Sequence, residues 1–117
     1  MVAYNKAMEK QAAVSAADLV FKALADAGRR RLLDRMRVKG GLTLNELCAG
    51  MDMSRQAVTK HLDQLEEAGL VETRRVGRER LHYLNPVPIH EIARRWIRPF
   101  EESRLDALRN LKSQLES

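Results

Sequence analysis

The stretch that decides the fold is Met53–Asn85, which reads MSRQAVTKHLDQLEEAGLVETRRVGRERLHYLN. In its first half, Ser54 can cap a helix, and the apolar residues that follow recur at helical spacing. In its second half the period changes, and two short extended runs, Leu70–Val76 and Glu79–Leu84, flank Gly77. We therefore expect an amphipathic helix that leads into a basic two-stranded hairpin.

A second helix precedes this stretch across a short turn. Thr43 and Glu46 stand three residues apart in the capping-box pattern Thr-Leu-Asn-Glu, and Gly50 marks the end of this helix. Only a short turn separates Gly50 from Ser54. Two helices joined by such a turn are typical of a helix-turn-helix unit.

Helical periodicity continues on both sides of this unit. Upstream, we expect two short helices with Gly28 between them, the second closed by the glycine pair at 40–41. Downstream, Pro86 and Pro88 end the hairpin, and Pro99 divides the following helical pattern into two parts. The apolar residues at helical spacing are Leu19, Val20, Ala23, Leu24, Leu32, Leu33 and Met36 upstream, and Ile89, Ile92, Ala93, Trp96, Ile97, Leu105, Leu108, Leu111 and Leu115 downstream.

These elements predict a mainly α fold with a small β-hairpin, a winged helix-turn-helix, as one domain over residues 1–117. Residues 1–17 are expected to form an N-terminal helical extension. Residues 86–117 are expected to form C-terminal dimerisation helices, because a leucine-lined helix that follows a complete core needs a partner.

The bulk composition is that of a soluble globular protein. Of the 117 residues, 44% are hydrophobic and 32% charged, and no apolar run reaches the roughly 18–20 residues of a membrane helix. The single cysteine cannot form an internal disulfide, which favours a reducing compartment. We expect a cytoplasmic protein without a membrane partner.

The net charge of +5 suggests an anionic partner, and its distribution is uneven. Arg29–Lys39 holds six basic residues against Asp34 alone, an excess equal to the whole net charge. The alternative is that these side chains are merely solvated. In the helix after Ser54 the acidic residues Asp63–Glu67 occupy the second half, so we expect the N-terminal half to face phosphate and the acidic end to be turned away.

The outward face of that helix suits the major groove of double-stranded DNA. Gln56 can bond bidentately to adenine and Arg55 to guanine, and Thr59 can meet a thymine methyl or a phosphate. The helix N-terminus at Ser54 can hold a phosphate through its backbone amides. The predicted DNA-binding residues are Ser54, Arg55, Gln56, Thr59, Lys60 and His61 on the helix and Arg74, Arg75, Arg78 and Arg80 in the hairpin.

Three segments together resemble the winged-helix repressors of the ArsR type. LVFKALADAGRRRLLDRM resembles the opening of that family, SRQAVTKHLDQLEEAGLV its recognition helix, and RRVGRERLHYLN its wing. The resemblance covers about Asp18 to Ile97. It implies a homodimer that binds a near-palindromic operator and represses transcription, with the first and last helices as the dimer interface. The expected interface residues are Leu19, Val20, Trp96, Ile97, Phe100, Leu105, Leu108, Leu111 and Leu115.

The metal ligands that the resemblance implies are incomplete in this chain. The family's thiolate site uses a Cys-x-Cys pair, whereas this chain reads Leu47-Cys48-Ala49-Gly50. The family's second site uses paired Asp and His on the C-terminal helix, where this chain has only His90 beside Glu91. We predict no metal site and no cofactor. The alternative is a metal- or redox-sensing repressor that uses Cys48 or His90.

Without a metal site, the signal that controls the regulator is expected to be a small molecule, a partner protein or the abundance of the protein itself. Trp96, Phe100, Ile92 and Ile97 could line an apolar effector pocket, although interface core is the favoured interpretation. No catalytic motif is present, so an enzyme is not expected. The competing function is a winged-helix protein-interaction module, which would not need a basic polar face on its recognition helix.

Overall fold

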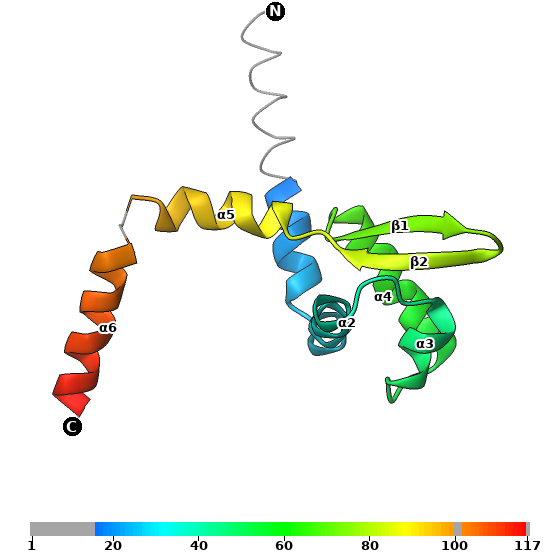
Figure 1. Cartoon of the computed structure of the whole chain (residues 1–117), viewed down its shortest axis with the longest axis horizontal. Helices are drawn as coiled ribbons and strands as arrows, with labels where there is room; N and C mark the ends of the chain where they lie inside the picture. Colours follow the sequence, from blue (N-terminus) through cyan, green and yellow to red (C-terminus); the bar gives the residue numbers. More distant parts are fainter. Residues whose placement is uncertain (1–15, 100–101, 117) are drawn as a thin grey trace, which may run out of the picture.

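The computed structural model describes residues 16–99 and 102–116 of the chain (Figure 1). Most of the expected extension at 1–17 therefore lies outside the described residues. The elements are a helical segment at 16–24, α2 (Ala27–Val38), α3 (Leu44–Ala49), α4 (Arg55–Glu67), β1 (Val71–Val76), β2 (Glu79–Leu84), α5 (Val87–Ile97) and α6 (Glu102–Glu116). Residues 16–84 are called the winged body below, and α5 with α6 the C-terminal arm.

Local capping sets where the helices of the body begin. The predicted capping box of Thr43 and Glu46 is confirmed at the start of α3. The predicted cap at Ser54 is also confirmed, since its hydroxyl accepts from the Ala57 N–H at 3.1 Å. The expected break at Gly28 is wrong. Asp26 caps α2 instead, accepting from the Arg29 N–H at 3.0 Å, and Gly28 lies in the first turn of α2.

One hydrophobic core unites the winged body. Its most deeply buried side chains come from α2, α3, α4 and the approach to β1, and they are Leu32, Leu47, Val58, Leu65 and Leu70. Because these four leucines and one valine are buried in a common core, the helix-turn-helix and the wing pack as one unit. The burial of Val58, Leu62 and Leu65 confirms the apolar side predicted for α4.

The wing is an antiparallel hairpin in which Val71 pairs with Leu84 and Val76 with Glu79. Gly77 makes the turn with a φ of +62°, a left-handed conformation that glycine adopts freely. The side chain buried in β2 is His82, at 5% exposed, rather than its neighbours Leu81 and Tyr83. The segment between α2 and α3 explains this, because Leu42 bridges to His82 as an added edge of the sheet.

The C-terminal arm leaves the body beyond Pro86. α5 begins at Val87, two residues before the predicted Ile89, since prolines are accepted in the first turn of a helix. In Figure 1 α5 leads away from the wing, and α6 lies apart from the other described helices. No residue of α5 is fully buried. Among the described residues, no helix has the length and apolar character needed to cross a membrane.

Candidate nucleic-acid interface

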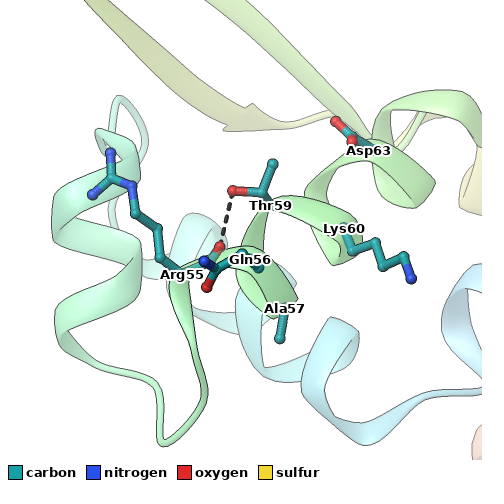
Figure 2. Close-up of a pocket in the computed structure, with 6 residues that line it drawn as sticks. All are labelled: Arg55, Gln56, Ala57, Thr59, Lys60 and Asp63. Atoms are coloured by element: carbon teal, nitrogen blue, oxygen red, sulfur yellow. Dashed lines mark hydrogen bonds between the residues drawn. The ribbon is translucent and has the colours of Figure 1, made fainter.

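The outward face of α4 carries the polar residues that the sequence predicts for base contact. Arg55, Gln56, Thr59 and Lys60 are all exposed, because the buried side chains of the same helix point the opposite way. Figure 2 shows them around a shallow hollow on the protein surface, lined also by Ala57 and Asp63. The geometry thus brings these four predicted residues together on one accessible face.

Two of these side chains are held by neighbours. The Thr59 hydroxyl donates to the Arg55 carbonyl oxygen at 2.9 Å, which leaves the Thr59 methyl group as its outward surface. The Arg55 guanidinium donates to Asn45 Oδ1 on α3, so it extends toward the neighbouring helix (Figure 2). Lys60 extends to the other side of α4. Arg55 and Lys60 therefore extend the basic face to both sides of α4.

Asp63 contradicts the expectation that the acidic half of α4 is turned away. It lies one turn beyond Thr59 and lines the same hollow, because positions i and i+4 of a helix share a face. A carboxylate there repels phosphate but can accept a bond from a cytosine amino group. Sequence reasoning missed it as a candidate base contact, although the four-residue spacing from Thr59 was available as a signal.

His61 does not lie on the outward face. Its side chain is 20% exposed, with Nδ1 3.3 Å from an Arg29 nitrogen and Nε2 3.7 Å from Asp26 Oδ2. The Arg29 backbone N–H, reinforced by the charges of His61 and Arg29, holds the pKa of Asp26 below its ordinary value. The prediction of His61 as a DNA contact is therefore corrected, because its ring faces α2.

The four arginines of the wing have different surroundings. Arg75 and Arg80 are cross-strand partners, and Arg80 pairs with Glu66 of α4 at 3.1 Å. Arg74 lies over the Tyr83 ring, 5.5 Å from its centroid. Arg78 follows Gly77 at the exposed tip. Arg78 is thus the wing arginine placed farthest along the hairpin, whereas Arg80 already has a carboxylate partner.

The basic run at 29–39 is partly used inside the protein. Arg29 donates to the Lys22 and Ala23 carbonyls, and Arg30 donates to the Leu24 carbonyl at 2.7 Å. Arg35 donates to the carbonyls at positions 46 and 47, in the middle of α3. Both interpretations made from sequence, a phosphate-binding surface and simple solvation, missed this role. The remaining exposed cations of the run are Arg31, Arg37 and Lys39.

The candidate metal ligands lie apart. Cys48 packs against the core, and His82 donates from Nδ1 to the Leu42 carbonyl at 2.9 Å. His90 and Glu91 are exposed on α5. Within residues 16–99 and 102–116, no three His, Cys, Asp or Glu side chains gather in a way that could hold a metal ion.

The expected dimer residues divide between the body and the arm. Val20 is 3% exposed and belongs to the core of its own chain, so its side chain is not available for contact with a second copy. Trp96 and Ile97 are exposed, and Trp96 lies 5.9 Å from the ring of Phe21, which the sequence did not single out. Phe100 lies outside the described residues. The other predicted positions are Leu19, which packs against the core, Leu105, partly exposed, and Leu108, Leu111 and Leu115, all exposed.

Comparison with known proteins agrees with this geometry. Residues 24–74 match the sequence family described as a helix-turn-helix domain. The uncharacterised HTH-type transcriptional regulator YuzN of Bacillus subtilis is 40% identical over 86 residues, which cover 68% of this chain and 94% of YuzN.

Two solved structures extend the comparison to the fold. An ArsR-like transcriptional regulator from Rhodococcus sp. RHA1 matches with a TM-score of 0.68 and 30% identity, covering 86% of this chain and 95% of that one. The homodimeric winged helix-turn-helix DNA-binding domain of Mb0332 from Mycobacterium bovis, a possible ArsR-family regulator, matches with a TM-score of 0.63 and 25% identity, covering 72% of this chain and 78% of that one.

Proposed function

Because the chain belongs to the ArsR family of helix-turn-helix transcriptional regulators, we propose that it is a homodimeric repressor that recognises a near-palindromic operator through α4. The membership makes it a DNA-binding transcriptional regulator and not an enzyme. The proposal adds the assembly, the form of the operator, the contact residues and the direction of control.

The observation that carries the proposal is the outward face of α4. Gln56 can bond to adenine and Arg55 to guanine when the helix lies in the major groove, and the Thr59 methyl group can meet a thymine methyl. We assign Arg78, which is exposed at the tip of the wing, to a flanking phosphate or the adjacent minor groove. In this arrangement α4 supplies base preference and the wing supplies affinity.

Exposed apolar side chains support the homodimer. Phe21, Trp96 and Ile97 are 45%, 55% and 50% exposed in the single chain, and the arm adds exposed leucines. A second copy can cover them, and the similar Mb0332 domain is itself homodimeric. Two copies present two recognition helices to half-sites about one helical turn apart, which binds DNA much more tightly than one copy does.

We further propose repression without the family's thiolate or histidine metal site. A dimer bound across a promoter blocks it by occupancy alone. The lone Cys48 lies against the core and His82 is bonded to Leu42, so neither of these side chains is arranged as an open metal ligand. Release from DNA would then depend on a small molecule, a partner protein or protein concentration.

The test is selection of bound sequences from a random duplex pool with the purified full-length protein. The expected result is a palindromic consensus, with affinity that falls steeply as salt rises because phosphate contacts release counterions. No enrichment, together with no binding to random duplex at low salt, would contradict DNA recognition and favour a protein-docking role. Repeating the selection with Zn²⁺ and with an oxidant tests the absence of metal and redox sensing, since a change in affinity would contradict it.

A further inference from the structure

Arg29 joins three elements of the winged body through one side chain. It is 9% exposed, and its Nε and one terminal nitrogen donate to the Ala23 and Lys22 carbonyls at 2.7 and 2.9 Å. These carbonyls end the helical segment 16–24, where a cation is favourable to the helix dipole. The other terminal nitrogen lies 3.3 Å from Nδ1 of His61 on α4. One guanidinium thus bridges segment 16–24, α2 and α4.

The chemistry of the contact defines its direction. A guanidinium only donates, so Arg29 donates to His61 Nδ1, and Nε2 is the second ring nitrogen of His61. That nitrogen faces Asp26 Oδ2 at 3.7 Å, and the same oxygen accepts from the Arg29 backbone N–H at 3.0 Å. Asp26, Arg29 and His61 therefore form a closed ring of contacts between α2 and α4.

Gly28 shows how closely the two helices approach at this point. A Cβ atom at Gly28 would lie 3.0 Å from Asp26 Oδ2 and from the Met53 methyl group, and 3.3 Å from His61 Nε2. These distances are shorter than ordinary carbon contacts, so a side chain here would require the neighbouring Asp26, Met53 and His61 atoms to shift by a few tenths of an ångström. The start of α2 therefore packs closely against His61 of α4.

We propose that Arg29 and His61 are positioning residues that fix α4 relative to segment 16–24, and so set the distance between the two recognition helices of the dimer. The inference rests on the proposed homodimer. Phe21 lies on segment 16–24 and faces Trp96 of α5, on the surface proposed for dimerisation. The next residue, Lys22, offers the carbonyl that Arg29 holds. One polar route from the dimer surface to the recognition helix therefore passes through two side chains, Arg29 and His61.

Arg30 provides a matched control. It also extends from α2 and donates to a carbonyl at the end of segment 16–24, Leu24, at 2.7 Å. That contact is exposed and ends at the segment, without involving α4. Arg30→Met consequently removes a bond of the same kind while leaving the connection through His61 intact.

The experiment measures affinity of the full chain for palindromes made from the selected half-site, with the spacer lengthened or shortened by one and two base pairs. Wild type is expected to show one preferred spacer. His61→Leu should lower the affinity ratio between the preferred spacer and its neighbours by about fivefold or more, a typical coupling between sites. His61→Gln keeps a bond acceptor and should restore much of the preference, and Arg30→Met should keep the wild-type profile. Dimer dissociation constants and melting temperatures are measured for each variant.

The outcomes separate positioning from stability. A flattened spacer profile with unchanged dimerisation and unchanged affinity for one half-site supports the inference. A uniform loss of affinity at all spacers, with the preference retained, overturns it and leaves a role in fold stability alone. If His61→Leu does not fold, Arg29→Lys is measured in the same way, since one ammonium group cannot contact two carbonyls and the histidine in the same geometry. A wild-type protein with no preferred spacer would instead contradict the proposed homodimer.

Discussion

The winged body and the C-terminal arm bury their apolar residues in different ways. In the body, Leu47, Val58 and Leu65 are fully enclosed by the same chain. In α5 no residue is fully buried, and the leucines of α6 at 108, 111 and 115 are 56%, 53% and 79% exposed. The same residue types thus serve two purposes, one inside the chain and one at its surface.

This difference predicts two kinds of stability. A core enclosed by one chain gives a free energy of unfolding that does not depend on concentration. An apolar surface covered by a second copy contributes only when that copy is bound, so its contribution rises with protein concentration. Substitutions in the two regions should therefore respond differently to dilution, and this can be measured.

The largest effect is expected in the core of the body. Leu65→Ala removes a fully buried side chain and should lower the free energy of unfolding by about 3 kcal/mol or more, from lost burial and the cavity left behind. Leu111→Ala in α6, where the side chain is 53% exposed, should change it much less in dilute solution. Urea unfolding followed by circular dichroism measures both changes. Equal losses of unfolding free energy would contradict the difference between the winged body and the C-terminal arm.

The arm should respond through assembly. Trp96→Ala removes a half-exposed aromatic side chain and its contact with Phe21, and should raise the dimer dissociation constant about tenfold to hundredfold. Val38→Ala changes a residue that is 76% exposed on α2 and should leave the constant unaltered. Sedimentation over a range of concentrations measures it. A Trp96→Ala protein that dimerises as wild type does would move the interface elsewhere.

Within the body, the recognition helix and the wing can be compared in the same manner. Gln56→Ala should cost about 1–3 kcal/mol on the selected operator and relax base preference, because it removes the proposed contact to a base edge. Arg55→Ala should act similarly. Arg78→Ala should weaken binding to all sequences and reduce the salt slope by about one, as loss of one phosphate contact does. Titrations on specific and random duplexes at several salt concentrations distinguish these effects. Unchanged operator affinity in all three variants would contradict the proposed DNA-contact surface.

The smallest expected effect concerns the cap of α2. The Arg29 backbone N–H holds the pKa of Asp26 below its ordinary value, so ionised Asp26 stabilises the folded state at neutral pH. This contribution is lost as the pH falls through the lowered folded-state pKa, below the roughly 3.9 of an unperturbed aspartate.

Asp26→Ala should therefore cost about 1 kcal/mol at pH 7, and the difference from wild type should shrink in strong acid. Unfolding titrations at pH 7 and at several values below 4 measure this change. Asp52→Ala, at an exposed position in the turn, is the control. A difference that grows with acidity would contradict the assignment of Asp26.

The features that depend on short sequence spacing could be predicted from the chain. The capping box of Thr43 and Glu46, the cap at Ser54 and the hairpin turn at Gly77 each depend on residues a few positions apart. The outward face of α4 followed from helical periodicity in the same way. Fold and recognition helix were therefore accessible to local reasoning.

The features that depend on distant residues could not be predicted. Arg29 meets His61 across 32 positions, and Arg80 meets Glu66 across 14. From sequence, Arg80 and His61 are predicted to contact DNA and Arg29 is part of a basic run, because nothing local shows that each already has a partner. Only the three-dimensional structure shows which polar side chains bond within the protein and which are exposed for binding.

The bridge between Leu42 and His82 has a consequence for the order of folding. An isolated two-stranded hairpin is only marginally stable in water, and here its buried histidine bonds to a residue 40 positions earlier in the chain. Leu42 is synthesised first, so on the ribosome the hairpin meets a partner that is already present. During refolding from denaturant the wing needs this long-range contact in addition to hairpin formation, and hairpins form more slowly than helices do. We expect wing amides to become protected from hydrogen exchange after those of α4, so that the body gains its recognition helix before its wing.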